Sequence, residues 1–430
     1  MDGRLRGARW MVAALVATAI GLPAAAPALA EDARPTVDPT APTPTAPYGG
    51  PPPQGSAPDG RTVGGEALHT RGVIVTDGAP ALPQGVAANG WLVADAGTGD
   101  VLAARDPHGR YYPASTLKTL TLLTLAPVLD PATVVNGTVE DEKIEGSRVG
   151  LVQGGRYPVS LLFRALILQS GNDAANALAR TAGGVAATVA AMNETAADLG
   201  AYDTVAGTPS GLDVAGQSSS PYDLALIFRA LLADPTTAAV LTTPVADIPP
   251  VEGRSAGYQI QNQNPLAGTP GNLGGKTGFT DAARHTFVTA AERNGRRLVV
   301  SVMDTESVPL RAADQAALLL DWGFAVPAGV GGVGTLVHSG ELPPSASTST
   351  TGSPTRDPAP GPQTAGVAGA PPSPWIGLAL GAGAVAIVAA TLIGRRRAVR
   401  VVRVVRPPSG AAPREDPPPR SAGGSPSKRP

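Results

Sequence analysis

The sequence predicts an α+β domain in which the sheet is closed by strands from distant parts of the chain. Apolar runs at 90–95 and 100–104, joined by Ala96-Gly97-Thr98-Gly99, indicate an antiparallel hairpin. Helical periodicity follows over 115–125, 160–168, 173–182, 221–232 and 312–322. Strand patterns return at 286–292 and 297–304, on either side of the turn Arg293-Asn294-Gly295-Arg296. Strands thus flank a helical middle.

Two apolar segments outside this region predict how the chain meets a membrane. Basic residues before the apolar run 10–22, and small residues ending at Ala30, are typical of a secretory signal peptide over 1–30. The uncharged segment 375–394 is long enough for one transmembrane helix. The tail 395–430 holds ten Lys or Arg against two acidic residues, which places it in the cytoplasm. An uncleaved anchor and a buried core helix are the alternative interpretations of the two segments.

Composition sets the remaining boundaries. Residues 31–71 are rich in Pro, Ala and Gly, which predicts a disordered leader. Residues 72–340 should form the folded domain. Residues 341–374 are dominated by Pro, Ser and Thr, which predicts an extended stalk. We therefore expect a single-pass cell-membrane protein with its folded domain outside the membrane and its basic tail inside.

Charge and residue usage exclude several classes of function. The net charge of -1 argues against a nucleic-acid partner, because no basic excess is present to displace counterions. The chain has no cysteine, which excludes disulfides, thiolate chemistry and cysteine-bound metals. Its four histidines are scattered, so a histidine-rich zinc cluster is not expected. We expect neither a metal nor another cofactor.

Three short motifs carry the chemistry: Ser115-Thr116-Leu117-Lys118, Ser170-Gly171-Asn172 and Lys276-Thr277-Gly278. They are separated by 55 residues from Ser115 to Ser170 and by 106 from Ser170 to Lys276. Together they supply a nucleophile, a neighbouring amine, a second hydroxyl, an amide and a cationic strand. These groups suffice for acyl transfer through a serine ester without histidine.

The first motif places a hydroxyl and an amine on one helical face. Ser115 follows Pro113-Ala114 at the start of an apolar helix, where free N–H groups favour an oxyanion. Lys118 lies three residues on, among leucines that disfavour its charged form, so it is a candidate base. Taken alone, the motif also fits a serine N-cap beside a solvated lysine.

The other two motifs supply polar groups for a cleft. Ser170 can relay a proton, and Asn172 can hold Lys118 or a substrate carbonyl. Lys276 and Thr277 can bind a carboxylate, while Gly278 allows a close backbone approach. Read singly, each motif also fits an ordinary loop or turn.

In combination these motifs resemble those of the D-alanyl-D-alanine carboxypeptidases, low-molecular-mass penicillin-binding proteins of the S11 serine peptidase family. The resemblance rests on Pro113 to Lys118, Ser170 to Ala175 and Lys276 to Thr280, and it extends over about 72–324. Two further motifs support the resemblance: Gly211-Leu212-Asp213 and Asn262-Gln263-Asn264-Pro265-Leu266. The resemblance implies the penicillin-binding protein/β-lactamase-like transpeptidase fold, with an antiparallel sheet and a helical subdomain.

The resemblance also implies roles for individual residues. Ser115 would be the acylated nucleophile, Lys118 its base and Ser170 the proton relay. Asn172 would position the substrate, and Lys276 and Thr277 would receive its terminal carboxylate. The N–H groups of Ser115 and Phe279, beside Gly278, would form the oxyanion hole. The substrate would be the D-Ala-D-Ala end of the peptidoglycan stem peptide, and β-lactams would act as covalent inhibitors at Ser115.

Two other functions remain as alternatives. A class A β-lactamase is expected to carry SDN and a deacylating Glu in an ExxLN loop, whereas this chain has SGN and no such word between Asn172 and Lys276. A silent wall-binding or β-lactam-sensing receptor would not need the intact Ser115–Lys118 pair. His285, near the third motif, is interpreted as a packed strand histidine or a group that tunes pH dependence. Some relatives carry a β-rich C-terminal domain, for which the roughly 17 residues after Phe324 leave little room.

Overall fold

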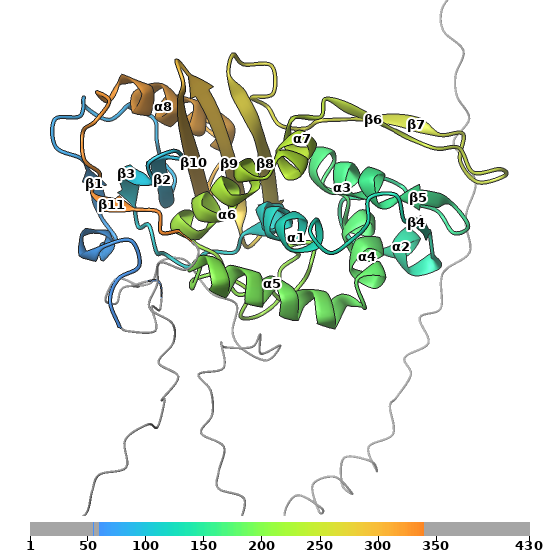
Figure 1. The fold of residues 1–430 in the computed structure, drawn as a ribbon. Coiled ribbons are helices and arrows are strands. Elements are labelled where there is room, and N and C mark those ends of the chain that lie inside the picture. The colour runs from blue at the N-terminus through green and yellow to red at the C-terminus, as the bar shows by residue number, and fades with distance from the viewer. Residues whose placement is uncertain (1–54, 56–59, 339–430) are drawn as a thin grey trace, which may run out of the picture. The chain divides into compact units, whose positions relative to one another are not determined.

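A seven-stranded antiparallel sheet lies at the centre of the computed structural model, which describes Gly55 and residues 60–338 (Figure 1). Its strands run in the order β1-β3-β2-β10-β9-β8, and β11 also pairs with β3. Their bounds are β1 (Val73–Val75), β2 (Gly90–Asp95), β3 (Asp100–Arg105), β8 (Asn272–Thr280), β9 (Arg284–Arg293), β10 (Arg296–Thr305) and β11 (Gly334–Thr335). The pairing of β2 with β10 joins segments about 200 residues apart and confirms the predicted α+β class.

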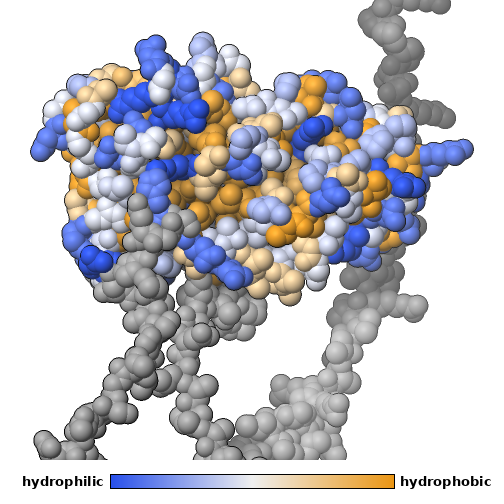
Figure 2. Space-filling view, viewed as in Figure 1, coloured by the Kyte–Doolittle hydropathy of each residue, from blue (hydrophilic) through white to orange (hydrophobic). Residues whose placement is uncertain are grey.

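Helices cover both faces of this sheet. Helix α8 (Ala312–Ala325) packs on one face and α6 (Pro221–Ala233) on the other. Along β2 the side chains alternate between the two cores: Trp91 and Val93 join the α8 side, whereas Leu92 and Ala94 join the α6 side. Because both faces are covered, β2 is apolar at nearly every position. Figure 2 shows apolar surface gathered across the middle of one face of the domain.

A helical subdomain extends beyond the β8 edge of the sheet (Figure 1). Its central helix α1 (Lys118–Leu125) is buried at all but one position and packs against several of the others. The remaining elements are η2 (Ala114–Leu117), α2 (Val139–Lys143), α3 (Val159–Leu168), α4 (Asn172–Thr181), α5 (Val185–Leu199), α7 (Pro235–Thr242), the hairpin β4 (Val134–Asn136) and β5 (Arg156–Pro158), and the hairpin β6 (Val245–Ile248) and β7 (Tyr258–Gln261). The helices and strands predicted between residues 90 and 322 therefore form, with ends shifted by a few residues.

Local sequence explains several boundaries. Ser220 accepts a hydrogen bond from the Asp223 N–H and precedes Pro221, so α6 starts with a side-chain cap and a proline at its first position. Helix α5 ends at Gly200, whose φ of 83° lies in the left-handed region. Asn294 and Gly295 both have positive φ, 51° and 78°, as a two-residue turn between β9 and β10 requires.

The expected disordered leader proves shorter than predicted, because residues 60–71 are part of the fold. Leu68, in the short helix η1 (Glu66–Leu68), is fully buried, and Val63 is 2% exposed. The Thr335 N–H donates to the Gly64 carbonyl at 2.8 Å, which ties this segment to β11. Composition misled here because two buried apolar side chains and a few hydrogen bonds to distant residues suffice to anchor a glycine-rich segment. The signal peptide, the rest of the leader apart from Gly55, the whole stalk 341–374, the 375–394 helix and the tail lie outside the described residues.

Across residues 60–338 no single helix combines the length and apolar composition needed for a span. Only α6 and α7 taken together meet both criteria, and they are bent by 107° where they join.

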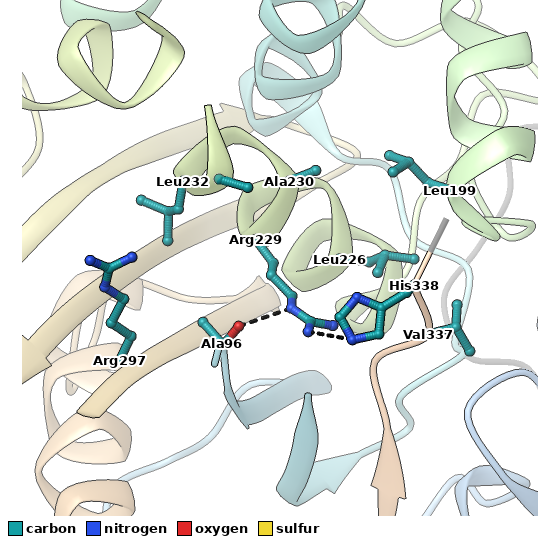
Figure 3. A pocket seen from close by; sticks show the side chains of 10 residues that line it. Ala96, Leu199, Leu226, Arg229, Ala230, Leu232, Arg297, Val337 and His338 are labelled. Atoms are coloured by element: carbon teal, nitrogen blue, oxygen red, sulfur yellow. Dashed lines mark hydrogen bonds between the residues drawn. The ribbon is translucent and has the colours of Figure 1, made fainter. Parts of the chain in front are cut away.

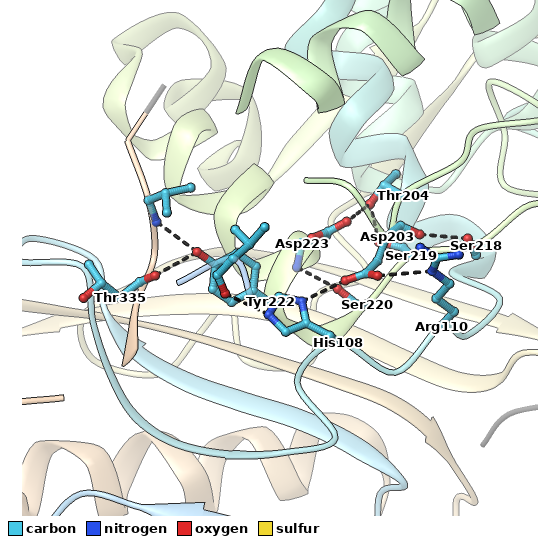
Figure 4. Close-up of polar contacts among 12 residues, drawn as sticks. His108, Arg110, Asp203, Thr204, Ser218, Ser219, Ser220, Tyr222, Asp223 and Thr335 are labelled. Atoms are coloured by element: carbon cyan, nitrogen blue, oxygen red, sulfur yellow. Dashed lines mark hydrogen bonds and ion pairs between the residues drawn. The ribbon is translucent and has the colours of Figure 1, made fainter. Parts of the chain in front are cut away.

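A fully buried histidine joins the N-terminal segment to the domain (Figure 4). His108 Nδ1 lies 2.8 Å from Asp203 Oδ2, and its Nε2 lies 3.0 Å from the Val63 carbonyl oxygen. Both partners accept hydrogen bonds, so the ring satisfies both only when it is protonated. Burial alone lowers the pKa of His108, but the hydrogen bond and charge of Asp203, together with the charge of Asp223, outweigh burial and raise this pKa above its usual value.

We predict that the stability of the domain falls as His108 loses its proton. A raised folded-state pKa means that this stabilisation is complete below the unfolded-state pKa of about 6.5 and is lost as pH rises through the higher folded-state pKa. The expected loss in the free energy of unfolding is about 1.5–3 kcal/mol, the typical contribution of a hydrogen bond to a charged group. Urea unfolding from pH 5 to pH 9 measures it. His108→Gln should remove this pH dependence while His69→Gln keeps it, and an unchanged profile in His108→Gln would contradict the assignment.

Candidate active site

The first motif is held against the sheet by close backbone packing. A Cβ atom added at Gly278, on β8, would lie 2.9 Å from the backbone N of Ser115 and would collide with the Thr286 hydroxyl. That hydroxyl donates to the Pro113 carbonyl oxygen at 2.9 Å. Only glycine therefore allows β8 to approach Ser115 this closely, in agreement with the expectation for Gly278.

Ser115 lies in a 3₁₀ turn and not in the α-helix that the sequence predicted for it. The turn η2 comes first, and α1 begins at Lys118. A 3₁₀ turn has about three residues per turn, so positions three apart lie directly above one another. Lys118 Nζ is accordingly 2.9 Å from Ser115 Oγ. The apolar periodicity of the sequence does not reveal this tighter winding, which aligns the Lys118 amine with the Ser115 hydroxyl.

The Lys118 amine is completely buried and has three oxygen partners. Besides Ser115, Nζ donates to Asn172 Oδ1 at 2.7 Å and to the Ser210 carbonyl oxygen at 2.6 Å. The Asn172 amide is oriented because its Nδ2 donates to the Glu145 carbonyl at 2.8 Å. Two of the three partners can only accept, so a neutral amine uses its two N–H groups on them and directs its lone pair at the Ser115 hydroxyl.

Electrostatics favour that neutral form. Burial is the main cause that lowers the pKa of Lys118 well below its usual value, and the nearby Lys276 charge lowers it further. The Asp173 charge opposes these effects only in part. The arrangement therefore gives Ser115 a base that is available near neutral pH.

The second motif reaches the site through a strained turn. Ser170 has a φ of 60°, so it adopts the left-handed conformation at this turn. Gly171 is required for space, since its Cβ would lie 2.7 Å from Asp173 Oδ1. Ser170 is 7% exposed, and its hydroxyl makes no hydrogen bond to another described residue. The turn brings Asn172 to Lys118 and places Ser170 beside Asn172.

Asp173 fixes a loop beside the site, a role that sequence reasoning did not assign. Its buried carboxylate accepts N–H groups from Val149, Gly150 and Leu151 at 2.8–3.0 Å. The N–H of Asn172 donates to the Ser147 carbonyl at 2.7 Å in the same loop. The loop 145–151 is therefore fixed to the start of α4, next to the Asn172 amide.

The third motif lies on β8, at the edge of the sheet, where strand pairing leaves one side open. Lys276 is 2% exposed and donates to the Thr277 carbonyl at 2.7 Å, and its burial lowers its pKa to about 7. Thr277 is half-buried. Phe279 is 50% exposed and packs on His285 with ring centroids 4.6 Å apart, so that histidine is a packed strand residue.

A backbone atom also contacts Lys118 at the site, and the sequence did not predict this contact. The Ser210 carbonyl reaches Lys118 because Gly211 turns the chain with a φ of 81°, and a side chain there would collide with the Ala114 carbonyl. The same loop is tied to β8, since the Thr280 hydroxyl donates to Asp213 at 3.0 Å. The motif Gly211-Leu212-Asp213 marked this loop in the sequence. A sequence motif does not show which backbone carbonyl will enter the site, so the role of the Ser210 carbonyl was not predicted.

The group of side chains that resembles a metal site among the described residues lies elsewhere. His108, Asp203 and Asp223 are close enough together to hold an ion. Both nitrogens of His108 already face hydrogen-bond acceptors, as described above. The site at Ser115 instead offers a hydroxyl, an amine whose pKa is lowered, an amide and a second lysine, which are groups for serine acyl transfer.

These features define a serine enzyme that uses a lysine as its base. The sequence model of the D-alanyl-D-alanine carboxypeptidase family matches residues 77–307, so the chain belongs to this family. It is 46% identical over 255 residues to D-alanyl-D-alanine carboxypeptidase DacB2 of Mycobacterium tuberculosis, covering 58% of this chain and 86% of that protein. It is 33% identical to DacA of Escherichia coli over 57% of this chain and 62% of that protein.

Solved structures give the same result. The D-alanyl-D-alanine carboxypeptidase of Mycobacterium tuberculosis H37Rv matches with a TM-score of 0.58 and 43% identity, over 61% of this chain and 99% of that one. The Streptomyces K15 DD-transpeptidase matches with a TM-score of 0.54 and 26% identity, over 57% of this chain and all of that one. The expected α+β penicillin-binding protein-like fold is confirmed.

We predict that Gly278→Ala slows acylation at Ser115 by about 10²-fold or more, because a displacement near 1 Å at a reacting group has that effect. The added Cβ must move either β8 or the turn that carries Ser115. Second-order acylation by a fluorescent penicillin measures the effect. Gly268→Ala is the matched control, since nothing lies within 4 Å of a Cβ at that position. Equal acylation rates in the two variants would show that the close approach is not required.

Proposed function

We propose that this protein is a serine-type D-Ala-D-Ala carboxypeptidase that removes the terminal D-Ala from peptidoglycan pentapeptide stems. One observation carries the proposal: the completely buried Lys118 amine lies 2.9 Å from Ser115 Oγ and has its other hydrogen bonds satisfied by two carbonyl oxygens. This is the geometry of a hydroxyl with its base in place. Membership of the carboxypeptidase family identifies the acyl donor.

In the acylation step, neutral Lys118 takes the Ser115 proton while Oγ attacks the carbonyl carbon of the penultimate D-Ala. The N–H groups of Ser115 and Phe279 stabilise the oxyanion. Ser170 then passes a proton from Lys118 to the nitrogen of the terminal D-Ala, the C–N bond breaks, and an ester to Ser115 remains. Water then attacks this ester while Lys118 takes one of its protons. The bond between Ser115 Oγ and the acyl carbon breaks, the proton passes from Lys118 to Ser115 Oγ, and the shortened stem leaves.

Lys276 and Thr277 receive the carboxylate of the terminal D-Ala, and Asn172 positions the scissile amide. The open edge of β8 suits an extended peptide, whose backbone can pair with the strand. A β-lactam presents a strained amide and a carboxylate in the same arrangement, so it acylates Ser115. This accounts for penicillin binding by the same site.

The β-lactamase alternative gains no support from the site. Deacylation in class A β-lactamases uses a glutamate acting on water. Glu194, an acidic residue between the second and third motifs, is exposed on α5. Near Asn172, Glu145 contributes its backbone carbonyl and not its carboxylate, and the Asp173 carboxylate is already engaged by three N–H groups of the loop 145–151.

The sequence outside residues 60–338 supports a place at the cell membrane. Segment 375–394 serves as one transmembrane helix, the stalk 341–374 leads to it, and the basic tail 395–430 stays in the cytoplasm. The signal peptide 1–30 exports the catalytic domain to the peptidoglycan. The enzyme then acts on the wall while it is anchored to the membrane.

We predict a bell-shaped pH dependence of kcat/KM. Its rising limb follows deprotonation of Lys118, whose lowered pKa makes the base available. Its falling limb follows deprotonation of Lys276, whose pKa is about 7, because neutral Lys276 no longer attracts the substrate carboxylate. Lys276→Arg keeps its charge at high pH and should move the falling limb upward. A falling limb unchanged in Lys276→Arg would assign it to another group.

Ser115→Ala tests the proposed function directly. We expect D-Ala release from diacetyl-Lys-D-Ala-D-Ala to fall by at least about 10³-fold, because the nucleophile is lost. Covalent labelling by penicillin should disappear as well. Ser160→Ala, at a serine on α3 outside the cleft, is the matched control. If wild-type protein is labelled by penicillin at Ser115 but releases no D-Ala, the receptor interpretation replaces the carboxypeptidase.

A further inference from the structure

A hollow of about 350 Å³ opens between α6 and the end of the described chain (Figure 3). Apolar side chains form most of its wall: Leu226, Ala230 and Ala233 from α6, Leu199 from the end of α5, and Val337. None of the residues at the catalytic site lines it. It is therefore a separate feature of the domain, and its role does not depend on the proposed activity.

The ionisable side chains that line the hollow are all basic: Arg229, Arg297 and His338. Arg229 is fixed in the wall, where it donates to the Ala96 carbonyl at 2.9 Å and to the Leu336 carbonyl at 2.8 Å. Its third nitrogen lies 2.9 Å from His338 Nε2. Arg297 is paired with Glu292 at 2.5 Å, and His338 Nε2 accepts from Arg229 because a guanidinium can only donate, so the Arg229 guanidinium supplies the positive charge of the rim. An apolar hollow with this charge at its rim is complementary to a large apolar side chain that has a carboxylate beside it.

The chain supplies such a pair just beyond His338. Glu341 and Leu342 follow three and four residues later, and three or four extended residues span about 10–14 Å. Between 339 and 355, Glu341 is the only charged residue and Leu342 the only large apolar one. Pro343 follows directly and restricts Leu342 to extended backbone, which lowers the entropy cost of holding it in place.

We propose that Glu341–Leu342 docks in this hollow, with Leu342 against the α6 leucine and alanines and Glu341 facing the basic rim. So short a tether gives an effective concentration in the millimolar range, so weak contacts are enough to fill the site. The first free residue of the stalk is then Pro343, and the stalk leaves the domain from the α6 face. This contact sets how the catalytic domain is presented relative to its membrane anchor.

Cleavage after Glu341 by a Glu-specific protease tests the proposal on the full-length protein in detergent micelles. A synthetic peptide of residues 336–350 is the unprotected reference, and the product is identified by mass. We expect the protein to be cut at least about 10-fold more slowly than the peptide. Ala233→Trp, at an exposed position that lines the hollow, should fill it and raise the cleavage rate to that of the peptide.

Ala190→Trp, at an exposed position of α5 outside the hollow, is the matched control and should retain the protection. Wild-type protein cut as fast as the peptide overturns the proposal. Protection that survives Ala233→Trp overturns the location. Protection that falls on dilution identifies a second copy of the chain as the occupant. Laurate, an anionic detergent, should compete with Leu342 for the hollow, so we expect protection to be lost when laurate is bound stoichiometrically. Laurate binding that leaves protection intact overturns it.

Discussion

The burial of the Lys118 amine is the constraint on which the site depends. In water this amine would be charged and inert as a base, whereas the core of the helical subdomain removes water from it on every side. Two carbonyl oxygens satisfy its N–H groups, so the neutral form suffers no unpaired polar group. The α1 core therefore has a chemical role in addition to stabilising the fold.

The same core fixes the nucleophile. The turn that carries Ser115 is pressed against β8, and it is tied to β9 by the hydroxyl of Thr286. On the other side, Asp173 clamps the loop 145–151 and keeps the Asn172 amide oriented. Sheet, turn and loop come from three distant parts of the sequence, and each is held by contacts that a single added methyl group would disturb. Rigid support of this kind keeps reacting groups aligned.

Much of the fold was predictable, because each strand or helix has its own local signal. The 90–104 hairpin, the 286–304 hairpin and the helices at 160–168 and 221–232 were visible in apolar periodicity and turn residues. The folded state of residues 60–71 was not visible, since it depends on two buried side chains in a segment of disorder-prone composition. The 3₁₀ turn at Ser115 and the left-handed Ser170 were also missed, because packing against β8 and α4 outweighs local preference there.

The sequence by itself determined the chemical groups: a serine and a lysine three residues apart, a second serine with an asparagine, and a lysine–threonine–glycine strand. Side-chain type and short spacing are local properties, so they can be read directly. Only the tertiary structure decided that the Lys118 amine loses its water, that Asn172 turns its oxygen toward it, and that the Ser210 carbonyl completes the set. A pKa and a hydrogen-bond partner depend on what surrounds an atom in space, and those neighbours lie 54 and 92 residues away along the chain.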